Sequence, residues 1–182
     1  QRAMSYQPIE NYGVIGDMRS VALVGKNGSI DWCCLPAFDS PSVFGAILDD
    51  RQGGCWSLAP AVDCIVRQMY LPDTNVLLTR FLSDSGVAEL SDFMPVEDAG
   101  VAHNLVRRAK TVRGEIHFAM RCDPRFDYAR VTHTVEQRGD KEILFLGRSG
   151  ARELVLRLRS SIPMQVSNGA AEAQFTLSAD ES

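Results

Sequence analysis

The sequence predicts an all-β protein, an antiparallel β-sandwich with at most short helical turns. Many short segments alternate apolar and polar residues, and each ends at Gly, Pro, Asn or Asp. No long stretch repeats its apolar residues with the 3.6-residue period of a helix. At 182 residues the chain fits one domain with a single core.

The most informative stretch covers residues 27–44 (NGSIDWCCLPAFDSPSVF). Asn27-Gly28 predicts a tight hairpin turn, because both residues tolerate positive φ. The apolar run at 29–35 is the strand that follows this turn. Pro36 ends the strand, since proline has no N–H to donate to a sheet.

A stiff loop with aromatic and acidic side chains follows that strand. Core packing is favoured for Trp32 and Phe38, because buried aromatics dominate sandwich cores. The alternative is that one of them reaches another domain and stacks on a sugar ring. Turn capping is favoured for Asp31 and Asp39, with a hydrogen bond to a sugar hydroxyl or an ion pair across a domain seam as the alternative.

The other segments are assigned in chain order. Residues 4–16 are a polar lead-in, and residues 42–48 fit one or two helical turns capped at Ser40 or Ser42. Arg113-Gly114 predicts a two-residue hairpin. Further strands are expected at 20–24, 55–58, 64–71, 75–82, 87–93, 104–112, 115–122, 130–137, 142–146, 153–159 and 173–177.

Two of these strands have informative faces. Ile116, Phe118, Met120 and Cys122 share one face, which is the pattern of a half-buried strand. Residues 143–146 are apolar on both faces, so this strand is expected to be central or to lie under a covering element.

Composition narrows the function classes. A net charge of −4 argues against nucleic acid as a partner, and no apolar run is long enough to cross a membrane. Five cysteines, two of them adjacent, favour free thiols in a reducing cytoplasm over a disulfide framework. The three histidines show no metal-ligand spacing with any cysteine, so neither a metal nor another cofactor is expected.

Several motifs together resemble a known family. Segments 9–17 (IENYGVIGD), 28–41 (GSIDWCCLPAFDSP), 92–95 (DFMP), 105–108 (LVRR) and 123–128 (DPRFDY) resemble, in order and spacing, the opening of bacterial glycoside hydrolase family 15 proteins, the trehalase and glucoamylase-like enzymes. The resemblance implies an N-terminal β-sandwich of the super-sandwich type. In such proteins an inverting catalytic (α/α)6 barrel follows and carries both catalytic glutamates, so no catalytic residue is expected in this chain.

The resemblance also implies a domain organisation. Residues 4–182 are interpreted as an N-terminal domain truncated before the barrel, whereas residues 1–3 are interpreted as a cloning remnant because they precede Met4. The barrel of the same polypeptide is the expected partner, and trehalose or maltooligosaccharide is the expected substrate of the whole enzyme. A loop at 31–40 is expected to face the active-site side, with candidate residues Asp31, Trp32, Pro36, Phe38, Asp39 and Ser40. Ala37 stands where many relatives carry arginine, so an arginine contact is absent from this loop.

Arg125 and Asp127 are secondary candidates. In an extended segment they would share a face and could pair or grip a partner loop, although a local ion pair near the turn after Pro124 is favoured. Arg107-Arg108 and Arg157 with Arg159 are interpreted as solvated or seam-facing charges.

Two other functions stay open. An autonomous carbohydrate-binding module for α-glucans would need a flat, exposed row of aromatics, whereas the two Trp and four Tyr residues are scattered. Catalysis by this chain alone would need a carboxyl pair in a cleft. Self-association is expected through an apolar seam near Trp32 and Phe38.

Overall fold

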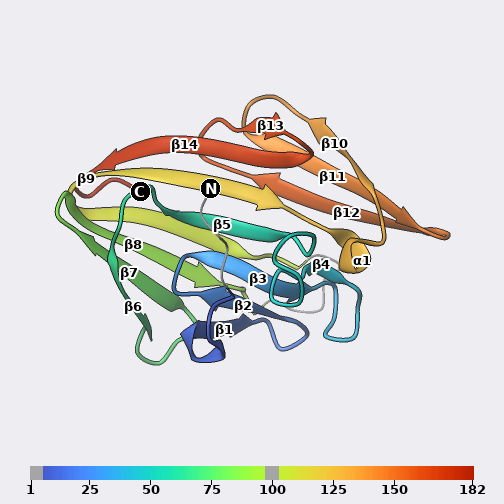
Figure 1. The fold of residues 1–182 in the computed structure, drawn as a ribbon, viewed down its shortest axis with the longest axis horizontal. Helices are drawn as coiled ribbons and strands as arrows, with labels where there is room; N and C mark the ends of the chain where they lie inside the picture. The colour runs from blue at the N-terminus through green and yellow to red at the C-terminus, as the bar shows by residue number, and fades with distance from the viewer. Residues whose placement is uncertain (1–5, 97–102) are drawn as a thin grey trace.

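The computed structural model describes residues 6–96 and 103–182, and the predicted cloning remnant at 1–3 lies outside this part. Its elements are antiparallel strands with two short turns (Figure 1). They are η1 (Ile9–Asn11), β1 (Tyr12–Gly16), β2 (Val21–Gly25), β3 (Ser29–Cys34), β4 (Ser42–Phe44), β5 (Cys55–Pro60), β6 (Ile65–Tyr70), β7 (Leu77–Ser83), β8 (Gly86–Phe93), β9 (Val106–Asp123), α1 (Phe126–Ala129), β10 (His133–Gln137), β11 (Glu142–Ser149), β12 (Arg152–Arg159), β13 (Gln165–Ser167) and β14 (Ala170–Ser178). The all-β antiparallel prediction is therefore confirmed.

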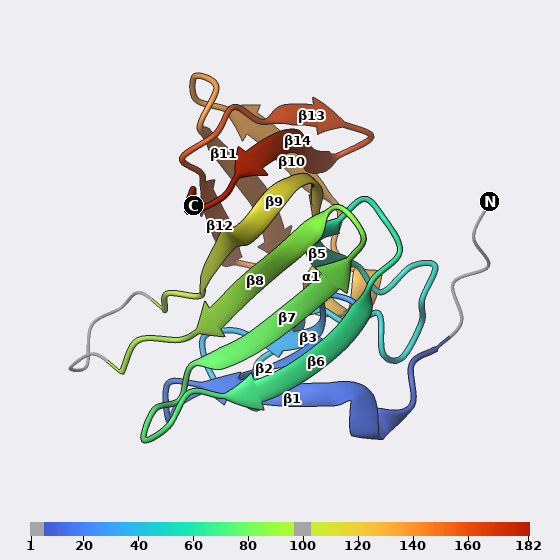
Figure 2. The same cartoon turned by 90° about the vertical axis from the view of Figure 1, so that its left-hand side faces the viewer.

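The strands form one large sheet and one small sheet. The large sheet has the order β1-β2-β3-β5-β9-β8-β7-β6, with β14 on β9, β13 on β14 and β4 on β3. Figure 2 shows it curling until β1 runs beside β6 and β7, where Tyr70 Oη donates to the carbonyl of Val14 at 2.8 Å. The small sheet, β10-β11-β12, lies beside β14 in both views. The sheet is thus almost closed, with the small sheet packed against one part of it.

Strand β9 corrects the prediction of a hairpin at Arg113-Gly114. It runs unbroken through both residues and joins two parts of the large sheet. Its first half pairs with β8, and its second half pairs with β5 and β14. Gly114 has a φ of +79° and lies opposite Gly86, close to the point where the pairing register shifts between Val87 and Ala88. The glycine therefore accommodates the change of partners and not a reversal of the chain.

Two other predictions at the N-terminal side were wrong. The polar lead-in contains η1 and strand β1, which pairs with β2 from Tyr12 to Gly16. Residues 42–44 form strand β4, which pairs with Cys33 and Cys34, instead of starting a helix. Their side chains are buried, and the chain then turns where the N–H of Gly45 donates to Gly53. Burial against β3 therefore overrides the local capping signal.

One hydrophobic core contains buried side chains from the large sheet and from the small one. Phe118 of β9 is fully buried and stacks on Phe175 of β14, with ring centroids 5.3 Å apart. The predicted alternation at 116–122 is confirmed, because Ile116, Phe118, Met120 and Cys122 are buried. β11 is the central strand of the small sheet, as its two apolar faces predicted, and even Leu144 on its outer face is buried.

Arg107 corrects the prediction of a solvated charge. Its side chain and that of Asp92 are fully buried, and Nε donates to Asp92 Oδ1 at 2.7 Å. The guanidinium also donates to the carbonyls of Trp56 and Gly28, and it lies 5.3 Å from the centroid of the Trp56 ring. One buried cation thus links β8, β9, β5 and the turn before β3. Arg108, in contrast, is exposed.

Arg157 and Arg159 are solvated charges, which is one of the two interpretations that the sequence allowed. Both side chains are more than half exposed, and both lie beside Glu142 across the small sheet. Exposed pairs of this kind contribute about 0–1 kcal/mol each.

All five cysteines are free thiols. Cys33, Cys34 and Cys122 are buried, and burial raises the pKa of the Cys33 thiol to about 12. A thiol this far from ionisation is a poor nucleophile at neutral pH. In the described part of the chain, no helix has the length and apolar character needed to cross a membrane.

Candidate functional site

The loop after β3 forms a compact turn. Ser40 Oγ accepts the N–H of Ala37 at 3.1 Å, and the N–H of Ser40 donates back to the carbonyl of Ala37 at 3.0 Å. Pro36 precedes the turn through a cis peptide bond. The turn leaves Pro36, Phe38 and Asp39 on the surface.

Asp31 is buried and does not project toward a partner surface. Its carboxylate accepts hydrogen bonds from Tyr12 Oη at 2.7 Å and from Ser29 Oγ. Burial of the Tyr12 ring, together with this bond to a carboxylate, raises the pKa of Tyr12. Asp31 therefore ties β1 to β3 inside the domain, and the structure separates it from the exposed part of the loop.

The core-packing expectation for Phe38 was wrong. Phe38 is 60% exposed, and its N–H donates to the carbonyl of Arg19 at 3.1 Å, so the backbone is fixed while the ring projects outward. Trp32 is half-buried on β3, and its ring lies 6.0 Å from the ring of Tyr128. Both aromatics of the predicted loop are thus partly at the surface.

The second candidate segment lies beside Trp32. Asp127, Tyr128 and Ala129 have φ values of +51°, +55° and +63°. The left-handed region costs about 1–2 kcal/mol per non-glycine residue and is seldom occupied by consecutive residues. Strained backbone of this kind is concentrated at functional sites.

Backbone hydrogen bonds fasten this left-handed turn to β4. The N–H of Tyr128 donates to Ser42 Oγ at 3.0 Å, and the N–H of Arg125 donates to the carbonyl of Val43 at 2.9 Å. Tyr128 remains 41% exposed, with the guanidinium of Arg130 5.8 Å from its ring centroid. The contact between Trp32 and Tyr128, which are 96 residues apart in sequence, therefore joins the two candidate segments at one end of the domain.

Arg125 and Asp127 are not paired along an extended strand. Arg125 lies 3.0 Å from Asp123, measured from Nε to Oδ1, and that carboxylate also contacts Arg121 at 3.1 Å. Asp127 lies in the left-handed turn, which separates its side chain from the strand direction of Arg125. The favoured local ion pair therefore forms with Asp123.

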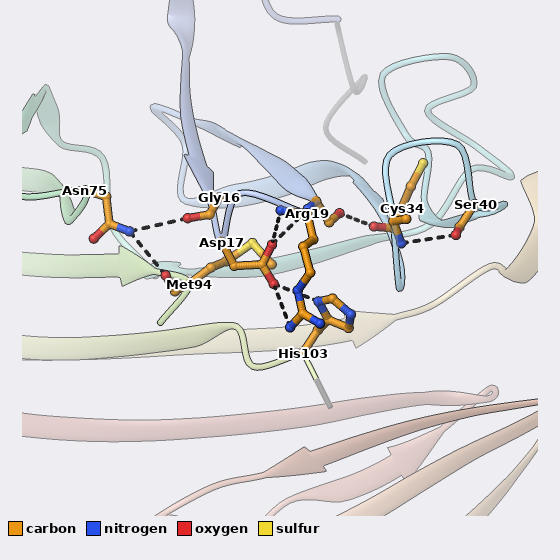
Figure 3. Close-up of polar contacts among 10 residues, drawn as sticks. Gly16, Asp17, Arg19, Cys34, Ser40, Asn75, Met94 and His103 are labelled. Carbon is orange, nitrogen blue, oxygen red and sulfur yellow. Dashed lines mark hydrogen bonds and ion pairs between the residues drawn. The ribbon is translucent and has the colours of Figure 1, made fainter. Parts of the chain in front are cut away.

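A buried carboxylate missed by the sequence argument lies behind the loop. Asp17 Oδ1 accepts the N–H groups of Arg19 at 3.0 Å and Ser20 at 2.8 Å, and Oδ2 lies 2.7 Å from His103 Nδ1 (Figure 3). Ser20 Oγ in turn donates to the carbonyl of Cys34, where the loop begins. The local signal was an Asp directly after an apolar segment, which favours an Asx turn.

Asn75 ties the same end of the domain together. Its Nδ2 donates to the carbonyls of Gly16 at 3.3 Å and Met94 at 3.2 Å (Figure 3). The turn before β2, the turn before β7 and the segment after β8 are thereby held side by side.

Replacing Ala129 by glycine is expected to raise the free energy of unfolding by about 0.5–1 kcal/mol. Glycine relieves the left-handed strain, and Ala129 is exposed, so little packing is lost. Denaturant unfolding measures the change. Ala119, exposed in the extended strand β9, is the matched control, and Ala119→Gly is expected to lower stability by about the same amount. Equal losses in both variants would contradict the strained turn.

Two hollows in the described residues offer no acid–base pair. One of about 350 Å³ lies between β9, β14 and the end of β12, and no Asp or Glu lines it. The other, about 410 Å³, lies on the small sheet and includes Glu153 as its one carboxylate. Hydrolysis of a glycosidic bond uses two carboxyl groups that flank the bond. Within the described residues, no group of three or more His, Cys, Asp or Glu side chains is placed to hold a metal ion.

Comparisons with known proteins identify the family of this chain. The family described as "Trehalase-like, N-terminal" matches residues 2–175. A trehalase of Mycolicibacterium smegmatis is 31% identical over 193 residues, which cover 94% of this chain and 29% of the relative. Trehalase 1 of Sulfolobus acidocaldarius is 40% identical over 152 residues, covering 83% of this chain and 25% of the relative.

A trehalase of Thermoplasma volcanium is 36% identical over 137 residues, covering 72% of this chain and 22% of the relative. No solved structure matches. The chain thus spans less than a third of the length of these curated relatives. The match over nearly its whole length shows that the chain belongs to the trehalase-like N-terminal domain family.

Proposed function

We propose that this chain is the non-catalytic N-terminal domain of an α-glucoside hydrolase of glycoside hydrolase family 15, and that it docks on the catalytic barrel of the same polypeptide. The observation that carries the proposal is the match of almost the whole chain to less than a third of several trehalases. The name of these relatives favours trehalose over maltooligosaccharide as the substrate. Five free cysteines favour the cytoplasm.

The docking surface is proposed to be the end formed by the 35–41 loop and the left-handed turn. Phe38 and Tyr128 expose aromatic rings there, while their backbones are fixed by hydrogen bonds. Fixed backbones lose little conformational entropy on binding, and exposed aromatics contribute much of the energy at interfaces. Asp39 and Arg130, both exposed, are available for polar contacts at the rim.

The experiment compares hydrolysis by the full-length protein with that by the 182-residue chain. Trehalose and maltoheptaose are the substrates. The full-length protein is expected to release glucose from trehalose, whereas the isolated chain is expected neither to hydrolyse nor to bind either sugar. The double variant Phe38→Ser with Tyr128→Ser in the full-length protein is expected to lower kcat/KM by about tenfold or more, in line with the loss of two aromatic contacts.

Val155 provides the matched control. It is 60% exposed, like Phe38, but lies on β12 of the small sheet, and Val155→Ser is expected to leave hydrolysis unchanged. Saturable sugar binding by the isolated chain would instead favour the carbohydrate-binding module. Unchanged hydrolysis in the double variant would place the docking surface elsewhere. The same variants, followed by light scattering, test whether the isolated chain self-associates through this surface.

A further inference from the structure

The turn between β1 and β2 is shaped by a single carboxylate. Asp17 accepts the N–H groups of Arg19 and Ser20 through Oδ1 and contacts His103 Nδ1 through Oδ2, and its side chain is almost fully buried. The turn has a strained apex, because Met18 has a φ of +71° and is 85% exposed. An exposed methionine gains nothing from packing there, so this conformation is held by the hydrogen bonds to the Asp17 carboxylate, together with the bond from the Asp17 N–H to the carbonyl of Ser20.

The same turn fixes the loop that follows β3 at two points. The carbonyl of Arg19 accepts the N–H of Phe38 at 3.1 Å, and Ser20 Oγ donates to the carbonyl of Cys34. Arg19 and Ser20 therefore have two roles: they bond to the loop, and their backbone N–H groups donate to the carboxylate of Asp17. Figure 3 shows the carboxylate of Asp17 joined by dashed lines to Arg19 and to His103, with Cys34 and Ser40 of the loop region to the right.

We propose that Asp17, in its ionised form, is the positioning residue of the 35–41 loop. It sets the turn at 17–20, and the turn sets the backbone of the loop at Cys34 and Phe38. His103 extends the connection to the segment that enters β9, since its Nδ1 contacts the second carboxylate oxygen. The position of the loop is a property of this chain alone, and only its consequence for hydrolysis rests on the proposed function.

The proposal predicts a pH dependence whose sign follows from the surroundings of Asp17. The groups that face it are His103, Arg19 with Nη2 at 3.9 Å, and the thiol of Cys33. Burial alone would raise the pKa of Asp17, but hydrogen bonds from His103, Ser20 and Arg19 outweigh it and lower the pKa. Asp17 is therefore ionised, and holds the loop, at pH values within and above the range in which carboxyl groups usually titrate. The loop is released as the pH falls through the lowered pKa of Asp17.

NMR of the 182-residue chain tests the proposal through the amide of Phe38. In Asp17→Asn, hydrogen exchange of this amide at neutral pH is expected to be about 10- to 100-fold faster, the range for lost hydrogen bonds to an ionised group. The amides of Leu90 and Phe118, both fully buried, are expected to keep their exchange rates. In the unmodified chain the shift of the Phe38 amide is expected to titrate below the usual Asp range, and this titration disappears in Asp17→Asn.

Asp39 is the matched control, because it is an exposed carboxylate next to Phe38. Asp39→Asn is expected to retain both the slow exchange and the acid titration. Unchanged exchange at Phe38 in Asp17→Asn, or a titration that persists in that variant, would overturn the proposal. Should Asp17→Asn fail to fold, the unmodified chain and His103→Gln decide. A Phe38 amide that does not titrate in the unmodified chain then overturns the proposal, and faster exchange of this amide in His103→Gln supports it. Hydrolysis enters none of these readouts, so failure of the proposed function is recognised separately.

Discussion

Replacing Arg107 by alanine is expected to lower the free energy of unfolding by about 3–5 kcal/mol. The substitution leaves the fully buried carboxylate of Asp92 without its cation, and it removes hydrogen bonds from the carbonyls of Trp56 and Gly28. A buried charge without a partner bears the full cost of leaving water. Urea unfolding followed by tryptophan fluorescence measures the loss.

Arg108 is the matched control for Arg107. It is the next residue on the same strand, but its side chain is exposed and reaches Ser182. Arg108→Ala is expected to change stability by no more than about 0.5 kcal/mol. Similar losses in the two variants would show that Arg107 is not the buried cation described above.

A double substitution separates the charge from the packing. Asp92→Leu combined with Arg107→Leu removes both ions together, and such replacements are often neutral or stabilising. The double variant is therefore expected to be more stable than Arg107→Ala alone. The difference would show that the pair acts mainly by cancelling charge, with the two carbonyls as the remaining cost.

The sequence predicted the strands more fully than the contacts between them. Alternation at 116–122 and the Asn27-Gly28 turn depend on neighbours within a few residues, and the structure has both. Arg113-Gly114 gave the same local signal as a true hairpin. Whether the chain reverses at Arg113-Gly114 or continues as one strand depends on which strands flank each half of β9. The local sequence carries no information about those strands.

In the candidate site, too, single residues could be predicted from the sequence but their contacts could not. Phe38 could be selected as a residue, but the position of Tyr128 beside Trp32 could not, because it depends on a left-handed turn without any glycine. Asp17 and His103 are 86 residues apart, and a lone His and a lone Asp give no pairing signal at that separation. Buried polar pairs between distant segments are thus the part of the fold that local patterns miss.

Replacing Gly28 by alanine is the second large effect expected. Gly28 has a φ of +78°, which costs an alanine about 1–2 kcal/mol. A Cβ at this position would also run into the carbonyl oxygen of Leu58 on β5, and relief of such overpacking costs about 1–3 kcal/mol. The sum predicts a loss of about 2–5 kcal/mol in the free energy of unfolding.

The variant Gly139→Ala distinguishes the cost of the left-handed backbone from the cost of the clash with Leu58. The φ of Gly139, +72°, is nearly the same, but no atom lies within 4 Å of a Cβ built there. Gly139→Ala is therefore expected to cost only the backbone part, about 1–2 kcal/mol. An equal loss in both variants would mean that β5 yields freely at Leu58. A larger loss at Gly28 would mean that β5 resists the displacement. The reason would be that the Gly28 carbonyl accepts the N–H of Leu58 and a hydrogen bond from Arg107. Moving β5 would therefore disturb the buried cation.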